Sequence, residues 1–212
     1  MQTKEAQKVY DNLALMHPNA ECELHFTTPF ELLVAVILSA QCTDARVNIV
    51  TDKMFKEINR PEQFASMTVD ELKPYIFSCG FYNNKGKNII AMSQELCDKY
   101  DGNVPDDFDA LTNLPGVGRK TASVITAVAF HKPAVPVDTH VNRVSLRIGL
   151  SQGKNVEEVE KDIKALFPPE QWNKLHHYLI FHGRYICHSK APECDKCNLV
   201  TVCQYYKNER GI

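Results

Sequence analysis

The stretch Leu-Pro-Gly-Val-Gly-Arg-Lys, residues 114–120, determines how the rest of the chain is interpreted. A helix-like segment at 107–112 precedes it, and an alanine- and valine-rich helix is expected over 121–130. Two glycines, Gly116 and Gly118, allow a tight turn and a close approach to a partner. The turn then opens a helix, whose free N–H groups and positive dipole end attract an anion. The pattern predicts a helix-hairpin-helix element at about 107–130 that grips a DNA phosphate without reading the base.

Lys120 stands at the start of the helix that follows this turn. One interpretation is that it contacts phosphate; the other is that it is a nucleophile. An amine attacks carbon only when it is uncharged, and the positive helix terminus and the neighbouring Arg119 both disfavour the ammonium form. The residues alone leave these two interpretations open.

Asp138 follows Val135-Pro136-Val137 and is expected to be the N-cap of a helix that runs to about Gly149. A structural cap is a sufficient explanation for an aspartate at this place. A carboxylate held at a helix N-terminus is also ionised and rigid. Such a group can stabilise a sugar cation or help a nucleophile to lose its proton.

Eight cysteines divide into two groups. Four are dispersed and are expected to be small buried hydrophobic residues. The other four fall within 17 residues with spacings of six, two and five: Cys187, Cys194, Cys197 and Cys203. Four thiolates complete the ligand shell of a tetrahedral zinc ion or of an iron–sulfur cluster. Only one Cys-x-x-Cys pair is present, and the spacing leaves zinc open.

Composition bounds the class of protein. The chain has 212 residues, 44% of them hydrophobic, and a formal net charge of −2. The longest apolar run, 32–40, is far shorter than the roughly 20 residues that span a bilayer. No signal peptide is apparent, so a soluble cytoplasmic protein without membrane contact is expected. The weakly acidic balance argues mildly against nucleic acid, but residues 111–150 carry five basic side chains against one acidic, a local net charge of +4.

Helical signals run along the whole chain. Capping boxes are expected at Thr28 to Glu31, at Thr68 to Glu71 and at Asn155 to Glu158. Residues 88–100 have a helical pattern, and no stretch alternates cleanly enough to form a strand. Residues 134–137 are apolar, but Pro133 before them and Pro136 among them indicate a linker rather than a paired strand. An all-α protein is predicted, with a domain boundary at this linker.

The chain resembles bacterial endonuclease III over essentially its whole length. The resemblance rests on Ser39-Ala40-Gln41, on 114–122, on Val137 to Arg143, on His182-Gly183-Arg184-Tyr185 and on the cysteine spacing. It implies an all-α fold with two parts: a helical barrel domain at 22–132 that bears the helix-hairpin-helix, and a second helical domain. The second domain would be formed by 1–21 and 133–212 around a [4Fe-4S] cluster, which the resemblance favours over zinc.

The resemblance also implies an activity and residue roles. The activity is that of a bifunctional DNA glycosylase and AP lyase of base excision repair, which removes oxidised pyrimidines from double-stranded DNA, nicks the abasic site and acts as a monomer. Lys120 resembles the Schiff-base nucleophile, Asp138 its catalytic carboxylate, and the four clustered cysteines the cluster ligands. Gln41 resembles the residue that fills the gap left by the extruded nucleotide. Phe81 stands where the family more often has leucine, and is expected to wedge into the opposite strand. Further DNA contacts are expected from Gly116, Val117, Gly118, Arg119, His140 and Arg143.

Two alternatives stay open. A monofunctional adenine glycosylase of the same superfamily would share the hairpin and the cluster but would lack the lysine at position 120, and a thymine–guanine mismatch glycosylase is a further relative. A non-catalytic DNA-binding module with a structural metal belongs to a different class. Trapping of a covalent adduct with borohydride separates the lyase from both.

Overall fold

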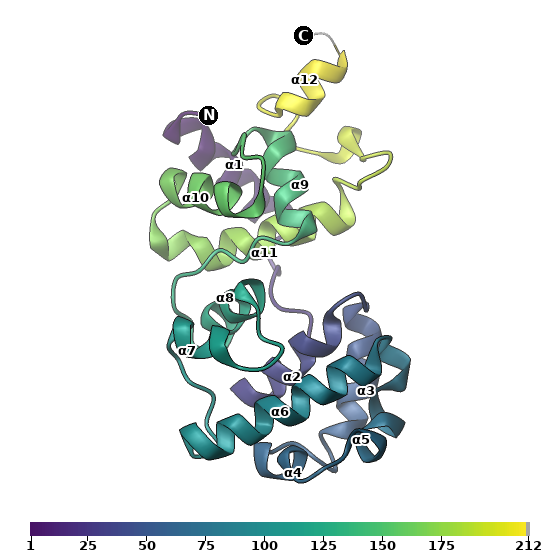
Figure 1. Cartoon of the computed structure of the whole chain (residues 1–212). Coiled ribbons are helices and arrows are strands. Elements are labelled where there is room, and N and C mark those ends of the chain that lie inside the picture. Colours follow the sequence, from purple (N-terminus) through teal and green to yellow (C-terminus); the bar gives the residue numbers. More distant parts are fainter. Residues whose placement is uncertain (211–212) are drawn as a thin grey trace. The chain divides into compact units, whose positions relative to one another are not determined.

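The computed structural model describes residues 1–210, and within them every regular element is a helix. This confirms the all-α prediction. The helices fall into two compact units, one formed by 23–131 and the other by 1–22 together with the chain from 132 onward (Figure 1). None of the helices in the described part is long and apolar enough to cross a membrane.

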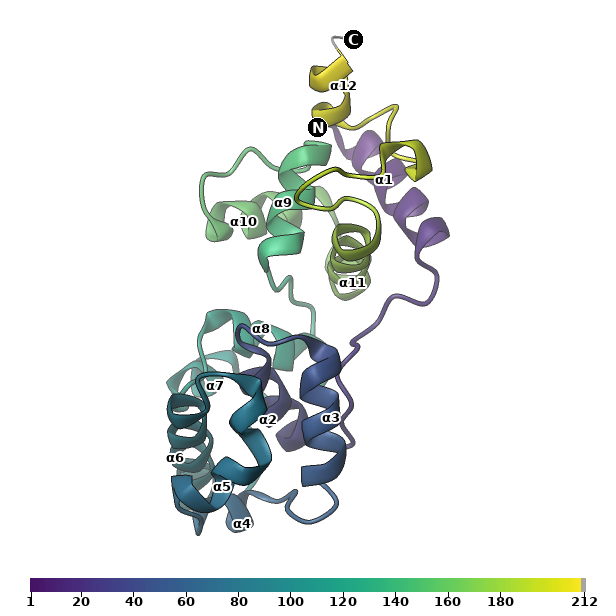
Figure 2. The same cartoon turned by 90° about the vertical axis from the view of Figure 1, so that its right-hand side faces the viewer.

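The unit of residues 23–131 is built around one nearly all-apolar helix, α2. Residues 30–35, 37 and 38 of this helix are buried, and α3, α6 and α8 pack against it (Figure 2). The helices of this unit are α2 (Pro29–Ser39), α3 (Asp44–Met54), α4 (Pro61–Ala65), α5 (Val69–Ile76), the 3-10 turn η1 (Phe77–Cys79), α6 (Tyr82–Tyr100), α7 (Phe108–Asn113) and α8 (Arg119–Val128).

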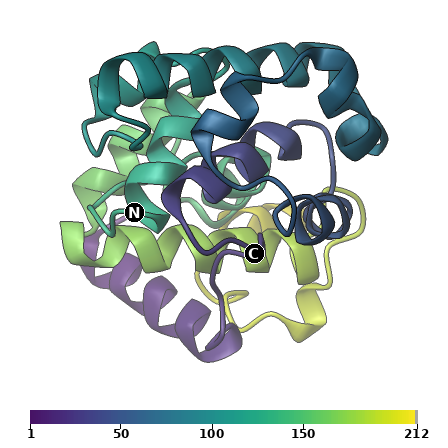
Figure 3. The ribbon, with the colours of Figure 1, turned by 90° about the horizontal axis from the view of Figure 1, so that it is seen from below.

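The second unit brings the N-terminal helix against the C-terminal half of the chain. Helix α1 packs on α11, and α9 lies against α10, α11 and α12; the α1–α11 pairing is visible in Figure 3. The helices of this unit are α1 (Thr3–Met16), α9 (Thr139–Ile148), α10 (Val156–Leu166), α11 (Pro169–Tyr185), the 3-10 turn η2 (Cys194–Lys196) and α12 (Gln204–Arg210). Their apolar faces share one core, which includes Val9, Leu13, Val144, Ile163 and Leu179.

Local capping agrees with the sequence at most helix starts. The hydroxyl of Thr28 accepts the N–H of Glu31, and the side chains of Thr68, Asp138 and Asn155 cap α5, α9 and α10. The capping box expected at Thr28 differs in its second hydrogen bond. The Glu31 carboxylate accepts from the N–H and hydroxyl of Thr27, at 2.6 and 2.7 Å, and not from the N–H of Thr28. Glu31 is 3% exposed, so these bonds compensate the loss of its hydration.

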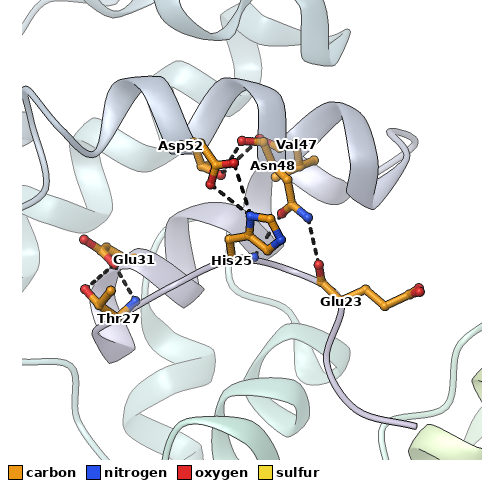
Figure 4. A network of polar contacts seen from close by, with 8 residues as sticks. Glu23, His25, Thr27, Glu31, Val47, Asn48 and Asp52 are labelled. Atoms are coloured by element: carbon orange, nitrogen blue, oxygen red, sulfur yellow. Dashed lines mark hydrogen bonds and ion pairs between the residues drawn. The ribbon is translucent and has the colours of Figure 1, made fainter. Parts of the chain in front are cut away.

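The segment that enters α2 is fastened to α3 by a network of polar contacts (Figure 4). His25 Nδ1 lies 3.0 Å from the Asp52 carboxylate, and the backbone N–H of His25 donates to Asn48. The Asn48 amide in turn donates to the carbonyl of Glu23 at 2.8 Å. These contacts fix where the first helix of the unit begins.

Two helix boundaries differ from the sequence-based expectation. Helix α6 begins at Tyr82 rather than near residue 88, and α8 begins at Arg119 rather than at 121. Gly86 lies inside α6, and because glycine is unfavourable in a helix, the sequence pattern placed the start of this helix too late. A Cβ at this position would lie 3.4 Å from Ile76 Cδ1 and 3.5 Å from Val69 Cγ1, which is ordinary van der Waals contact, so the packing against α5 does not require a glycine.

Candidate active site and metal centre

The turn at 114–118 joins α7 to α8 and is anchored from inside. Leu114 and Val117 are 2% and 5% exposed, and the Val117 N–H donates to the Leu114 carbonyl at 3.0 Å. Gly116 has a left-handed backbone with φ of +76°, and a Cβ there would lie 2.6 Å from Asn88 Cβ. Gly118 has an ordinary φ of −86° and open space around its would-be Cβ. The turn therefore requires only the first glycine, while the second keeps the outer surface bare.

Lys120 is the second residue of α8 and is exposed. No side chain caps this helix, because its N-cap is Gly118. An uncapped first turn presents N–H groups that an anion can occupy. Arg119 is fixed beside it, with its guanidinium carbon 5.3 Å from the centre of the Phe108 ring. A lysine amine and an anion site thus share the same helix terminus.

Asp138 is the N-cap of α9, as the sequence predicts. Its Oδ1 accepts the N–H groups of His140 and Val141 at 2.9 and 2.8 Å. Both bonds end on the same oxygen, which leaves Oδ2 for other chemistry while the side chain is held rigid. The cap and a catalytic role are therefore compatible.

Gln41 and Phe81 are both exposed and both have a left-handed backbone, with φ of 53° and 48°. This region costs a non-glycine residue roughly 1–2 kcal/mol. Gln41 follows the end of α2, and Phe81 is the N-cap of α6. Lys85, a buried residue of α6, donates from its amine to two backbone carbonyls near these residues: that of Leu38 in the last turn of α2 and that of Cys79 at the end of η1. Sequence reasoning missed this lysine; its signal is its place on the apolar face of α6.

His140 and Arg143, two expected DNA contacts, lie within α9 and touch the start of the cysteine loop. The Arg143 guanidinium donates to the carbonyls of Gly183 and Cys187 at 2.8 and 3.1 Å, and to Nδ1 of His140 at 3.2 Å. Burial lowers the pKa of His140. These bonds give Arg143 a structural task, and a DNA contact for either residue stays a prediction.

Arg147 likewise holds the cysteine loop, although the sequence showed it only as part of a local positive charge. Its guanidinium donates to the carbonyls of His188 and Ser189 at 2.6 and 2.9 Å and lies 3.5 Å from Cys187 Sγ. It also stacks on the ring of Tyr205 at 4.6 Å.

The four clustered cysteines line one cavity, together with apolar residues that include Ile148, Ile186 and Leu199. All four are free of disulfide bonds. Burial raises the pKa of Cys203, and that of Cys197 to about 11, so a stable thiolate here needs a positive partner. Two nitrogen atoms face the Cys197 sulfur: the Leu199 backbone N–H donates to it at 3.4 Å, and His182 Nε2 lies 3.6 Å from it.

His182 is in turn oriented by His17 at the end of α1. The His17 Nε2 and His182 Nδ1 atoms are 3.1 Å apart, and both rings are almost fully buried. Burial lowers the pKa of His182 to about 4, which keeps the ring neutral. Gly183 beside it lets α11 approach α9, since a Cβ would lie 2.9 Å from His140 Cβ. In the sequence, His182 and Gly183 stand out only as parts of the stretch His182-Gly183-Arg184-Tyr185.

The arrangement of the thiols tests which metal they fit. Within residues 1–210, no three His, Cys, Asp or Glu side chains converge closely enough to hold a single ion. A zinc ion needs four ligands around one centre. A multi-iron cluster binds each cysteine through a different iron atom, so its ligands stand farther apart around a larger space. Four sulfurs that line one apolar cavity are the donor set that a [4Fe-4S] cluster takes, so these residues fit such a group.

Comparison with known proteins places the chain in a family. The family model described as "HhH-GPD superfamily base excision DNA repair protein" matches residues 34–169. Endonuclease III of Bacillus subtilis (strain 168) is 49% identical over 202 residues, which cover 95% of this chain and 92% of that protein.

Solved structures of similar proteins agree with this. A non-covalent endonuclease III–DNA complex has a TM-score of 0.95 and 45% identity, with 100% of both chains covered. A trapped endonuclease III–DNA covalent intermediate, an estranged-adenine complex, has a TM-score of 0.94 and 45% identity, with 99% of both chains covered. The chain belongs to the HhH-GPD superfamily of base excision DNA repair proteins, and within it to the endonuclease III family.

Proposed function

We propose that this enzyme is a bifunctional DNA glycosylase and AP lyase that removes oxidised pyrimidines from double-stranded DNA and nicks the abasic site. The observation that carries the proposal is the exposed Lys120 at the uncapped N-terminus of α8, directly after the glycine turn. The similar endonuclease III trapped as a covalent DNA intermediate supports a covalent route. The enzyme would act where chromosomal DNA is, in the cytoplasm.

The amine of Lys120 is the nucleophile of the proposed reaction. Its nitrogen attacks C1′ of the damaged nucleotide, the N-glycosidic bond breaks, and the base leaves with the bonding electron pair and takes up a proton. The sugar ring opens to an imine between lysine and C1′. This imine makes a proton on C2′ acidic; once a base removes it, the C3′–O bond breaks and the strand is cut. Attack by water in place of lysine would leave no imine.

Asp138 supplies negative charge to the same reaction. The capped carboxylate is fixed in orientation, so it can stabilise positive charge on the sugar without reorganising. Its second oxygen can take the proton that the attacking amine gives up. General-base assistance of this kind contributes about 10²- to 10⁴-fold to a rate.

The damaged base must leave the helical stack before Lys120 can reach C1′. Gln41 would fill the space that the extruded nucleotide leaves, and Phe81 would enter beside the opposite base as an apolar wedge. Both side chains are exposed and stand on loops of the same unit. The exposure of Phe81 supports this role, since moving an apolar ring from water into a base stack is favourable.

The turn at 114–118 would hold a DNA phosphate. Replacing Gly116 with alanine forces a side chain into a left-handed position and against Asn88, so we expect a loss of about 2 kcal/mol of unfolding free energy and weaker DNA binding.

Gly118→Ala is the matched variant: an alanine there fits the backbone conformation and the open space, so the free energy of unfolding should change by less than about 0.5 kcal/mol. Its new methyl group should nevertheless weaken duplex binding several-fold. Thermal unfolding and fluorescence anisotropy measure both effects, and wild-type affinity in Gly118→Ala would contradict the phosphate contact.

Cys187, Cys194, Cys197 and Cys203 would hold a [4Fe-4S] cluster. The cluster would contribute folding free energy and not reaction chemistry, because four protein ligands leave it no open position. Arg147, His182 and the Leu199 N–H are placed to stabilise the thiolates. The cluster would thereby fasten the loop between α11 and α12, which Arg143 and Arg147 also tie to α9.

A substrate comparison tests the proposed function against its alternatives. We expect base release and nicking on a thymine glycol duplex, nicking on an abasic duplex, and neither on a duplex with mismatched adenine. Release of adenine without a nick would favour a monofunctional glycosylase. Binding to all three duplexes with no product would favour a non-catalytic DNA-binding module.

A further inference from the structure

Lys85 is a buried lysine on the apolar face of α6. Its side chain is 5% exposed, and Ile89, Met92 and Leu96, which share this face, are fully buried. A lysine normally keeps its ammonium group in water. Burial of such a charge is tolerated only where strong hydrogen bonds replace the lost hydration.

The partners of Lys85 are two backbone carbonyls at the ends of two helices. Its Nζ donates to the Leu38 carbonyl at 2.9 Å and to the Cys79 carbonyl at 2.6 Å. Leu38 lies in the last turn of α2, where carbonyls have no partner within the helix. Cys79 is the last residue of η1. Because the C-terminal ends of helices carry partial negative charge, one ammonium group satisfies both ends electrostatically.

Each of these carbonyls stands two or three residues before a left-handed, exposed residue. Gln41 lies three residues after Leu38, and Phe81 lies two residues after Cys79. The two loops also lie side by side, since the Cys42 thiol contributes, after burial, to raising the pKa of the Cys79 thiol. Left-handed backbone at non-glycine residues persists only where the surroundings hold it in place. The Lys85 side chain contacts the backbone close to both of these left-handed residues.

We propose that Lys85 is a positioning residue, whose ammonium group holds loops 39–42 and 79–82 together so that Gln41 and Phe81 enter the DNA duplex as one unit. The DNA role of the two side chains rests on the proposed function, whereas the clamp is a property of the free protein. A methionine at position 85 reaches as far as the Cε atom of the lysine but has no donor, so both carbonyls would lose their partner. The loops would then relax toward less strained conformations and present the two side chains separately.

Hydrogen exchange on the DNA-free protein tests the clamp. In Lys85→Met we expect amide exchange in 39–42 and 79–82 to become at least about tenfold faster, with no change in α1 or α11. Lys87→Met is the matched control, since Lys87 is an exposed lysine on the same helix. Unchanged exchange in both loops would overturn the clamp. Uniformly faster exchange over 23–131 would overturn it as well, because Lys85 would then serve general stability.

Incision kinetics test what the clamp does. Opening a duplex needs both loops, whereas a single-stranded abasic substrate has no partner strand to be wedged. We expect Lys85→Met to lose about tenfold more kcat/KM on an abasic duplex than on a single-stranded abasic oligonucleotide. The Lys87→Met control should show equal, small losses on both. Equal losses in Lys85→Met would refute the positioning role, whereas a wild-type enzyme inactive on every substrate would refute the proposed function instead.

Discussion

Replacing Lys120 with alanine is expected to abolish strand nicking at an abasic duplex, with a fall in rate of about 10³-fold or more. The reason is chemical: without the amine no imine forms, and without the imine the C2′ proton is not acidic enough to be lost. The fold should be unaffected, because Lys120 is an exposed residue of α8. Single-turnover incision assays with enzyme in excess measure the effect, and circular dichroism verifies the fold.

Arg119→Ala is the control for Lys120→Ala, because it removes an equal charge from the adjacent exposed position. It also removes the contact with Phe108, so it should weaken DNA binding and raise the enzyme concentration needed for saturation. At saturation its nicking rate should stay within a few-fold of the wild type. If the two variants lost the same amount of activity, Lys120 would be a phosphate contact rather than the nucleophile.

Replacing Cys197 with serine is expected to have the largest effect on stability. Cys197 contacts the core of its unit, and its sulfur receives the Leu199 and His182 contacts. Loss of this ligand should release the cluster and cost at least about 4 kcal/mol, which corresponds to a fall in Tm of roughly 10 °C for a chain of this size. Iron content, visible absorption and thermal unfolding measure the loss.

Cys97→Ser is the matched control for Cys197→Ser. Cys97 is one of the dispersed cysteines, in α6 of the other unit, and is not among the residues that line the cavity. We expect it to keep full iron content and a Tm close to that of the wild type. A Cys197→Ser protein with unchanged iron and colour would contradict the ligand assignment. Stoichiometric zinc in a colourless wild-type protein would replace the cluster with a single ion.

The sequence was informative wherever a structural rule acts over a few residues. Caps at Thr28, Asp138 and Asn155 were predictable because an N-cap bond spans two or three residues. The turn at 114–118 was predictable for the same reason, although the pattern could not tell that only Gly116 needs a left-handed backbone. That difference depends on Asn88, a residue of another helix.

Tertiary contacts set the parts that the sequence did not reveal. Arg143 and Arg147 contribute to a local positive charge, and only the fold shows that both donate to carbonyls of the cysteine loop. The burial of Lys85 depends on the C-terminal ends of α2 and η1, whose carbonyls both accept from its amine. The contact between His17 and His182 joins residues at opposite ends of the chain. No short pattern encodes such pairs.

The central claim is that one particular amine bonds to the sugar, and the most direct measurement is to find that bond. The enzyme is incubated with duplex DNA containing an abasic site, reduced with borohydride, digested with nuclease and protease, and analysed by mass spectrometry. We expect a deoxyribose remnant on the peptide that contains Lys120 and on no other lysine. A remnant on a different lysine, or no adduct at all with an enzyme that still cuts the strand, would contradict that claim.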